Sequence, residues 1–399
     1  MNAVRYSVLL PTRDGGPFLD ACLRSILTQD HPSFELVVSD NANDDETPEI
    51  LAGLGGDERV VSLRQETVLS VTENWTAALA ASSGEYVLMI GDDDLLLPGT
   101  MEALDRLLAG SDDPDCLSFD AFRYVAPAAV ADRPTSFYGS PYFGYERQLI
   151  EDGFLSATTR TGLVKDAYRF NLRFPLTMQL TLVKRAALER LPREPFRSAF
   201  PDHYAICALL LTARTWFVTD RQLLLIGVSP KSFGHYFLND QDEAGLRYLG
   251  LDTTFSGRLP GNQILNAQCD WLAETKNDFA ADLADTDIDR GVYVARQVRH
   301  WLRQYRRRAI PARVLLERIR LLSARDALAT IRAHADPKGV RAVMRAATGL
   351  RKTRTVYLDR DLVPLPGVAD ISQFAAWLDA RRLTPAHWPV DERSEGASK

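Results

Sequence analysis

The residues most suited to chemistry are three consecutive carboxylates, Asp92, Asp93 and Asp94, which follow the apolar stretch 86–90 and Gly91. Adjacent carboxylates repel one another, so their placement costs stability unless a cation offsets the charge. Mg²⁺ and Mn²⁺ prefer oxygen ligands and commonly use one or two carboxylates together with phosphate oxygens. The run therefore predicts a divalent metal site. The alternative is a solvated acidic turn that caps the helix expected from residue 98.

Two further polar groups follow apolar stretches earlier in the chain. Thr12 and Arg13 come after residues 6–11 and precede Gly15-Gly16, where backbone amides can approach a phosphate or a base. This loop matches neither the dinucleotide-binding nor the P-loop pattern, so both of those interpretations fail. Asp40 ends the second apolar stretch, where it can accept hydrogen bonds from a base or a ribose. Asp40 is also a common turn residue, which is the simpler interpretation of that position alone.

A candidate general base lies much later, in the stretch PDHYAICALLL, where Asp202 precedes an apolar helical pattern. Aspartate is also a favoured residue at helix starts, so an ordinary capping role competes with the catalytic one. His203 beside it is better explained as structural. His235 could contact a metal or a phosphate, or be an ordinary loop histidine.

The elements that position these residues alternate in a regular way. Apolar stretches predict strands at 6–11, 34–39, 60–64, 86–90 and 116–122. Helical patterns fall between them, near 16–29, 47–54, 71–83 and 98–109. Alternation of strands and helices predicts an α/β fold with a mostly parallel sheet flanked by helices. Ligands bind such sheets outside the carboxyl ends of the strands, where Thr12, Asp40 and Asp92 are expected.

Four ordered stretches resemble the family 2 glycosyltransferases, which have the GT-A fold. They are YSVLLPTRDGGPFLDACLRSILTQ, ELVVSDNANDDET, ENWTAALAASSGEYVLMIGDDDLLLPG and PDHYAICALLL. The resemblance covers roughly residues 5–235 and depends on the order and spacing of all four stretches. It implies an inverting transfer of a hexose-type sugar from a nucleotide-diphosphate donor, most often a UDP-sugar. The acceptor would be a hydroxyl of a glycan or of a lipid-linked molecule, in the synthesis of cell-surface polysaccharide.

The resemblance also implies roles for particular residues. The residues that it places at the nucleotide and the donor sugar are Pro11, Thr12, Arg13, Asp40, Asn74, Asp92 and Asp93. Asp94 would bind Mn²⁺ or Mg²⁺, with His235 near the metal or the diphosphate, and Asp202 would be the catalytic base. The family commonly has an acidic residue where Gly91 stands here. The division of roles among the three aspartates is therefore open by one position.

The composition argues against several other classes of protein. The four cysteines lie far apart and form no C-x-x-C pair, so zinc sites and redox pairs are not expected. The first residues lack a secretory pattern, and the apolar stretches are too short to cross a membrane. We therefore expect a cytoplasmic protein, in contact at most with the inner face of the membrane.

The chain has 399 residues and a net charge of −6, but residues 290–354 alone carry +15, which leaves −21 for the rest. Residues 296–322 place apolar side chains on one helical face among arginines. They can form a helix on an anionic membrane surface, or a helical subdomain packed on the catalytic domain. Nucleic-acid binding is not expected, because no recognition motif accompanies the charge.

We expect a catalytic domain over residues 1–260, a basic helical region over 261–390 and a disordered tail over 391–399. The helical region would serve acceptor, membrane-surface or oligomer contacts. Two other functions remain open from the sequence. One is a sugar nucleotidyltransferase, which shares a nucleotide-binding sheet but would want a more basic first loop. The other is a non-catalytic membrane-surface or scaffold protein.

Overall fold

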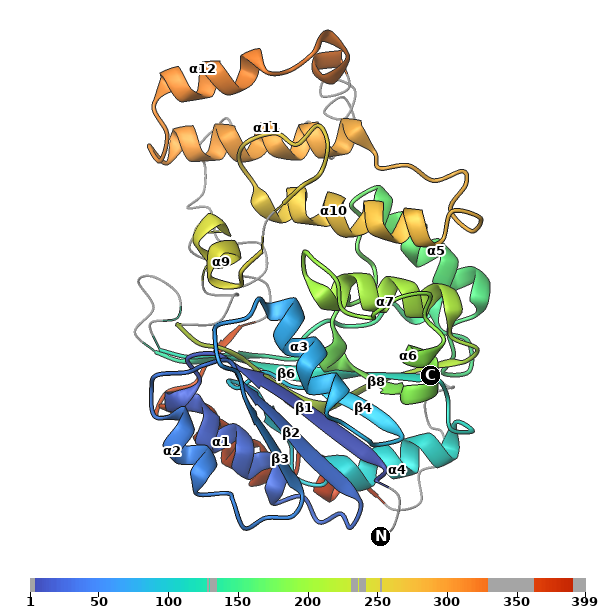
Figure 1. The fold of residues 1–399 in the computed structure, drawn as a ribbon, viewed down its shortest axis with the longest axis vertical. Helices are drawn as coiled ribbons and strands as arrows, with labels where there is room; N and C mark the ends of the chain where they lie inside the picture. Colours follow the sequence, from blue (N-terminus) through green and yellow to red (C-terminus); the bar gives the residue numbers. More distant parts are fainter. Residues whose placement is uncertain are drawn as a thin grey trace.

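The computed structural model describes residues 4–127, 129, 135–230, 236, 242–251, 253–328 and 362–389. The first part of the chain alternates strands and helices as the sequence predicts (Figure 1). The elements are β1 (Tyr6–Thr12), α1 (Gly16–Leu27), β2 (Phe34–Asp40), α2 (Thr47–Ala52), β3 (Val60–Arg64), α3 (Val71–Ala80) and β4 (Tyr86–Met89). Strand β1 pairs in parallel with β2 and β4, and β2 pairs in parallel with β3.

The remaining elements of this domain include strands that pair antiparallel. Its elements are β5 (Leu95–Leu96), α4 (Thr100–Gly110), β6 (Cys116–Val125), β7 (Phe137–Gly139), β8 (Thr181–Lys184), β9 (Trp216–Val228) and β10 (Val363–Pro364). Strand β8 lies antiparallel between β4 and β6, and β9 runs parallel to β6. The strand order is β10-β7-β6-β8-β4-β1-β2-β3, with β5 and β9 paired beside this path. The predicted α/β class is confirmed, and the sheet is mixed, with its parallel part on the β4–β3 side.

Alternating side chains of the parallel strands fill two separate cores, because successive residues of a strand point to opposite faces. Leu9, Val37 and Val87 face one core, together with α5 (Ala157–Tyr168) and α7 (Pro201–Thr212). Val8 and Leu36 face the other, together with α1 and α4. All four cysteines are free and buried.

The region after the sheet is helical, as predicted. It contains α9 (Asp242–Tyr248), α10 (Gln263–Asp278), α11 (Arg290–Arg306) and α12 (Ala312–Arg320). A third core joins α10 to α11 through Cys269, Tyr293 and Trp301. Figure 1 shows α11 and α12 at one end of the long axis of the molecule, with α10 between them and the sheet domain. No helix within the described ranges is both long and apolar enough to span a bilayer.

Residues 362–389 return to the sheet domain, although the sequence grouped them with the helical region. Strand β10 pairs antiparallel with β7 at the sheet edge. Helix α15 (Ile371–Asp379) buries Phe374, whose ring stacks on Tyr124 at 5.8 Å and meets Phe122 edge-on at 6.4 Å. Residues 362–389 therefore cover part of the sheet domain. The tail expected over 391–399 lies outside the described residues.

Replacing Phe374 should destabilise the whole sheet domain. We expect Phe374→Ala to lower the free energy of unfolding by roughly 3–5 kcal/mol, because a fully buried aromatic ring is lost and a cavity remains. Urea denaturation followed by circular dichroism measures this change. Leu383→Ala, in the same segment but 45% exposed, is the control and should change the free energy by less than about 1 kcal/mol. Equal effects of the two substitutions would contradict the packing described here.

The helical region should respond to acid through His300, which is buried in α11. Burial, with Arg303 and Arg318 nearby, lowers the pKa of His300 to about 4. An unfolded histidine has a pKa of about 6.5, so between these values only the unfolded chain binds the proton, and stability falls as pH falls. Between about pH 7.5 and about pH 5, the wild type should lose about 2 kcal/mol more than His300→Gln. Denaturation curves that shift equally in both proteins would sink this prediction.

Candidate functional site

The carboxyl ends of three neighbouring strands bring the predicted residues to one edge of the sheet. The register pairs Thr12 at the end of β1 with Asp40 at the end of β2. On the other side of β1, Leu9 pairs with Met89, and the amide of Ile90 donates to the Leu9 carbonyl at 3.0 Å. Asp92 follows two residues later. The expected juxtaposition of the loop after β1, Asp40 and the acidic run is therefore present.

Thr12 and Asp92 are joined directly. The Thr12 hydroxyl donates to Oδ2 of Asp92 at 2.6 Å, and both residues are buried. Gly15 passes so close that a Cβ there would lie 2.2 Å from Thr12 Oγ1 and 2.7 Å from Asp92 Oδ2. Glycine at position 15 therefore lets the loop after β1 fold against this pair, and a side chain would push the loop away.

Asp40 is held by protein groups on both carboxylate oxygens. Its Oδ1 accepts the amide of Asn43 at 2.9 Å, and its Oδ2 pairs with the Arg64 guanidinium. The Asn43 side chain in turn bonds to the Thr12 carbonyl at 3.2 Å and accepts the Asp14 amide at 2.7 Å. Asp40 and Asn43 thus lock the loops after β1 and β2 together.

Asp94 is the most enclosed of the three aspartates, at 1% exposed. Its Oδ2 accepts the Gly91 amide at 3.0 Å and the Gln179 side chain at 2.6 Å, while Oδ1 accepts the Gly227 amide at 2.8 Å. Burial raises the pKa of Asp94, and the neighbouring charge of Asp93 adds to this, while the Gly227 and Gly91 amides act in the opposite direction.

The packing around position 91 explains why glycine occupies it in place of an acidic residue. A Cβ at position 91 would lie 2.8 Å from Asp94 Oδ2 and 3.2 Å from Gln179 Nε2. A larger residue would therefore interfere with the bond between Asp94 and Gln179, on the short 3-10 helix η2 (Met178–Leu180).

Asp93 differs from Asp94 in exposure and in its partners. It is half-buried, and its Oδ2 accepts the Ser229 hydroxyl at 2.6 Å. Strand β9 approaches this residue closely, because a Cβ on Gly227 would lie 2.0 Å from the Asp93 carbonyl oxygen. Of the two, Asp93 has the carboxylate more accessible to a ligand.

A cluster of three or more histidine, cysteine, aspartate or glutamate side chains arranged to hold a metal is not found in the described part of the chain. His235, the second residue predicted at the metal, lies outside the described residues. The acidic run contributes carboxylate oxygens at this edge of the sheet. Such oxygens are the type of ligand that Mg²⁺ and Mn²⁺ prefer, and a cation there would offset the like-charge repulsion.

Arg13 contacts α9 through a reciprocal arrangement. Its guanidinium donates to the Tyr248 carbonyl and lies over the Tyr248 ring at 4.5 Å, while the Tyr248 hydroxyl donates to the Arg13 carbonyl at 3.0 Å. Burial raises the pKa of Tyr248, which keeps this hydroxyl a donor. The amide of Val71 also donates to the Leu249 carbonyl at 3.0 Å. Helix α9 therefore lies against both the β1 loop and the start of α3.

Asn74 and Pro11 lie close beneath this edge. The Asn74 side-chain oxygen accepts the Ser39 hydroxyl at 2.7 Å, and its nitrogen donates to the Ser39 carbonyl at 3.4 Å. Pro11 is the register partner of Ser39 in the β1–β2 pair. Asn74 thus supports the end of β2 from helix α3.

Asp202 lies in the first turn of α7. Its Oδ1 is 3.0 Å from Nδ1 of His203, whose ring packs at 5.2 Å from Phe200 and 5.5 Å from Trp271. No hydrogen bond among the described residues joins Asp202 to the acidic run. The short helix η2 connects the two regions, because it packs against both β4 and α7.

The contact residues that were not identified from the sequence include Gln179, Ser229 and Tyr248. Each is an ordinary polar residue with no motif around it, and each reaches the site from a distant part of the chain. Gln179 is 85 residues from Asp94, and Ser229 is 136 residues from Asp93. Asn43 could have been found, because it shares the SDNAND stretch with Asp40.

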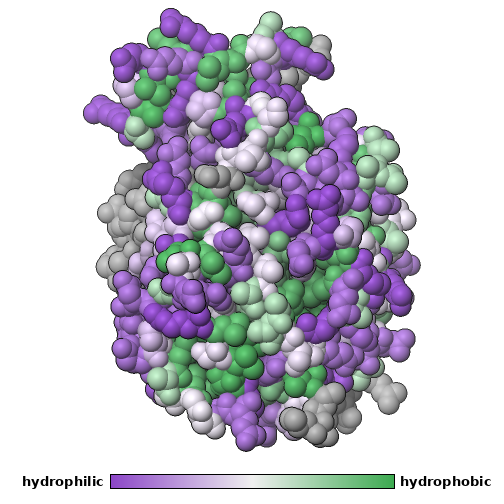
Figure 2. All heavy atoms as spheres, viewed as in Figure 1, coloured by the Kyte–Doolittle hydropathy of each residue, from purple (hydrophilic) through white to green (hydrophobic). Residues whose placement is uncertain are grey.

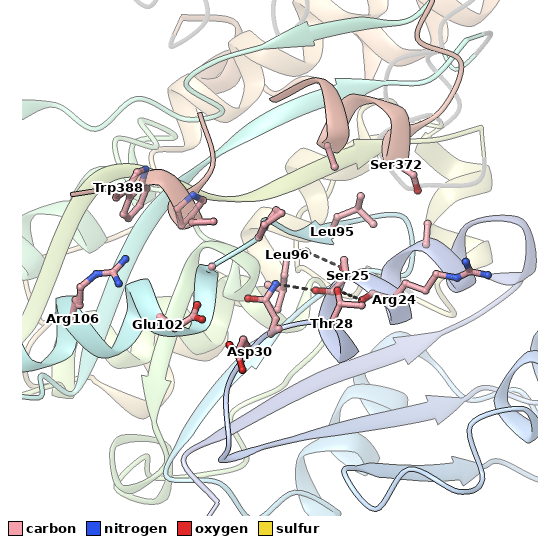
Figure 3. A pocket seen from close by; sticks show the side chains of 17 residues that line it. Arg24, Ser25, Thr28, Asp30, Leu95, Leu96, Glu102, Arg106, Ser372 and Trp388 are labelled. Carbon is pink, nitrogen blue, oxygen red and sulfur yellow. Dashed lines mark hydrogen bonds between the residues drawn. The ribbon is translucent and has the colours of Figure 1, made fainter. Parts of the chain in front are cut away.

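A pocket of about 600 Å³ lies elsewhere, between the sheet domain and the returning end of the chain (Figure 3). Its walls come from α1, α4 and β5 on one side, and from α15 and the 3-10 helix η3 (Pro385–His387) on the other. Glu102, Arg106 and Trp388 are among its lining residues. None of the predicted site residues lines this pocket, so it is separate from the acidic edge.

Comparison with known proteins agrees with this geometry. Residues 7–156 match the sequence model described as "Glycosyl transferase family 2". An uncharacterized protein of Mycobacterium tuberculosis is 35% identical over 102 residues, which are 25% of this chain and 31% of that protein. A GalNAc(5)-diNAcBac-PP-undecaprenol beta-1,3-glucosyltransferase of Campylobacter jejuni is 31% identical over 102 residues, or 25% of this chain and 33% of that one.

A longer match joins the chain to a PGL/p-HBAD biosynthesis glycosyltransferase of Mycobacterium bovis, at 28% identity over 180 residues, 44% of this chain and 66% of that one. The chain thus spans about a third of the first two relatives and just under two thirds of the third.

Two solved structures are similar at 16% identity. One is S. aureus TarS 1-349 in complex with UDP, with a TM-score of 0.45 over 92% of this chain and 98% of that one. The other is the mannosyltransferase PcManGT from Pyrobaculum calidifontis with GDP-Man and Mn²⁺, with a TM-score of 0.41 over 88% and 89%. The family match rests on the sequence, over the same strands that carry Thr12, Asp40 and the acidic run. Over residues 7–156, the chain is similar to glycosyl transferase family 2.

Proposed function

We propose that this protein is a metal-dependent, inverting glycosyltransferase that moves a hexose-type sugar from a UDP-sugar to a hydroxyl of a glycan or lipid-linked acceptor. The observation that carries the proposal is the shared edge of β2, β1 and β4. There Asp40, Thr12 and Asp92 meet within the stretch that matches the family. Two of the relatives named above are glycosyltransferases of glycan or glycolipid synthesis, which supports a role in making cell-surface polysaccharide or glycolipid.

We assign the metal to Asp93, supported by Asp92, in place of Asp94. The Asp94 carboxylate accepts three protein hydrogen bonds and is 1% exposed, so a cation would have to displace those donors. Asp93 is half-buried beside it. A divalent cation bound there would supply charge stabilisation for a departing nucleoside diphosphate. Asp94 would then stabilise the turn that orients the Asp93 side chain. His235 remains a second candidate ligand near the metal.

We propose that Pro11, Thr12 and the Arg13 backbone contact the nucleotide at the carboxyl end of β1. Asp40 and Asn74 would act mainly by fixing the loops, since their side chains bond to Asn43, Arg64 and Ser39. Arg13 could reach a diphosphate by leaving Tyr248, which would couple donor binding to the position of α9.

Asp202 is the proposed general base. Its carboxylate would take the proton of the acceptor hydroxyl as that oxygen attacks the anomeric carbon. The bond from that carbon to the diphosphate breaks in the same displacement, which inverts the configuration. His203 at 3.0 Å would orient the Asp202 carboxylate.

The direct test is a nucleotide-release assay with UDP- and GDP-sugars, in the presence of Mn²⁺ or Mg²⁺ and a set of hydroxyl acceptors. Release of nucleoside diphosphate with formation of a glycoside of inverted configuration is the expected result. Pyrophosphate production from a nucleoside triphosphate and a sugar phosphate would instead identify a nucleotidyltransferase. Binding of nucleotide sugars without turnover on any acceptor would favour a non-catalytic protein.

The two neighbouring aspartates should respond differently to substitution. Asp93→Asn should keep its stability within about 1 kcal/mol but lose roughly 100-fold or more of the metal-dependent activity. Its Mn²⁺ binding with UDP present, followed by electron paramagnetic resonance, should weaken as well. Asp94→Asn should lower the free energy of unfolding by about 1–3 kcal/mol, because an amide NH₂ would face buried N–H groups. The opposite pattern, with metal binding lost only in Asp94→Asn, would restore the metal role to Asp94.

Asp202→Asn should reduce kcat by roughly 10²–10⁴-fold, because the amide cannot accept the proton. Donor affinity, measured by calorimetry, should stay unchanged, since Asp202 acts on the acceptor. Asp220→Asn, an exposed carboxylate in β9, is the matched control and should keep full activity. If Asp202→Asn retains wild-type kcat, the base lies elsewhere.

A further inference from the structure

Helix α12 has an apolar face that the described protein does not bury. None of its nine residues is buried, in contrast to α10 and α11, which bury Trp271 and Trp301. Its inner side packs only partly, through Leu315 and the following Leu322, against the core around Trp301. The helix is therefore attached to α11 along one side and open along the other.

Several large apolar residues in and just after α12 remain exposed. Leu316 is 53% exposed, Ile319 is 42% exposed and Leu321 is 57% exposed. Leu316 and Ile319 are three residues apart, and Ile319 is four residues from Leu315, so the exposed pair forms the outer edge of the apolar face that packs partly on α11. Five of the nine exposed large hydrophobic residues of the described chain lie here, with Tyr305 and Leu328 completing the set. Single exposed apolar residues are ordinary, but a group of them on one surface marks a binding site.

Arginines surround these apolar residues. The exposed ones include Arg303, Arg306, Arg307, Arg308, Arg313, Arg320 and Arg325. Glu317 is the one acidic residue of α12, and it lies 3.6 Å from Arg313. Figure 2 shows hydrophilic and hydrophobic surface side by side at the end of the molecule where Figure 1 places α12. This end projects away from the sheet domain, so a flat surface can reach it.

We propose that the exposed apolar edge of α12, with the neighbouring turn at 306–308, docks on an anionic lipid bilayer. Leucine and isoleucine side chains would enter the acyl boundary, while the arginines contact lipid phosphates. A soluble polyanion would satisfy the arginines but would gain nothing from Leu316 and Ile319. The combination on one helix therefore favours a membrane surface. This inference does not depend on the proposed catalytic activity.

Vesicle co-sedimentation of the full chain, without nucleotide or metal, tests the proposal. The protein should bind phosphatidylcholine vesicles that contain about one third phosphatidylglycerol, and bind pure phosphatidylcholine at least tenfold more weakly. Raising the salt concentration should weaken binding, because exposed charges are screened. The triple substitution Arg306→Gln, Arg307→Gln, Arg308→Gln should reduce the partition coefficient on the order of 100-fold, from about 1 kcal/mol per arginine.

A separate variant tests how much the apolar side chains contribute to vesicle binding. Leu316→Ser with Ile319→Ser should weaken binding at least tenfold, and both residues are exposed, so folding should be unaffected. Leu172→Ser, at a 40% exposed leucine elsewhere, is the matched apolar control. Arg24→Gln, Arg106→Gln and Arg147→Gln, all exposed and remote, form the matched charge control. Both controls should bind vesicles as the wild type does.

Several outcomes would overturn the proposal. Binding that ignores Leu316 and Ile319, but is competed fully by a short oligonucleotide or heparin, would indicate a soluble polyanion. A dimer in solution that the double serine variant dissociates, with no vesicle binding, would show that a second copy covers this face. Equal binding to neutral and anionic vesicles would remove the role of the arginines. Nucleotide release on a water-soluble acceptor, measured alongside, reports the catalytic proposal separately.

Discussion

The buried carboxylate of Asp94 joins three segments of chain that are far apart in sequence. It accepts the Gly91 amide at the end of β4, the Gln179 side chain from η2 and the Gly227 amide from β9. Taking a carboxylate out of water is costly unless hydrogen bonds compensate, and here three donors do so. The consequence is local rigidity at the turn where Asp92 and Asp93 stand. In the metal site proposed above, Asp92 and Asp93 would meet the cation from this fixed backbone.

The strands, the helices between them and the acidic edge followed from patterns that act locally. Alternating apolar residues fix which face each strand buries, and strand-end polar residues must lie at the same edge once β1, β2 and β4 are parallel. Thr12, Asp40 and Asp92 could therefore be brought together from the sequence. The antiparallel half was harder, because β8 and β10 are short and pair with strands that are distant in sequence. Local sequence patterns do not predict which distant strand such a short strand will pair with.

The sequence could identify the residues of the candidate site, but it could not show which role each residue takes. Three adjacent aspartates look equivalent as letters, and only packing separates the enclosed Asp94 from the half-buried Asp93. The same limit applies to Arg13 and Asn74. Both were expected at the nucleotide, and both bond to protein groups, Tyr248 and Ser39, that lie far along the chain or on another element. Gln179 carries no motif at all, so its contact with Asp94 could be found only in three dimensions.

Helix α9 links the two ends of the molecule. It touches the loop after β1 through Arg13 and Tyr248, touches the start of α3 through Leu249, and packs against α10 on its other side. Helix α10 shares a core with α11, whose far side carries α12. A continuous series of packed helices therefore runs from the arginine-rich surface to the loop beside Thr12. The loop after β1 and the proposed docking face are thus connected through helices that pack on one another.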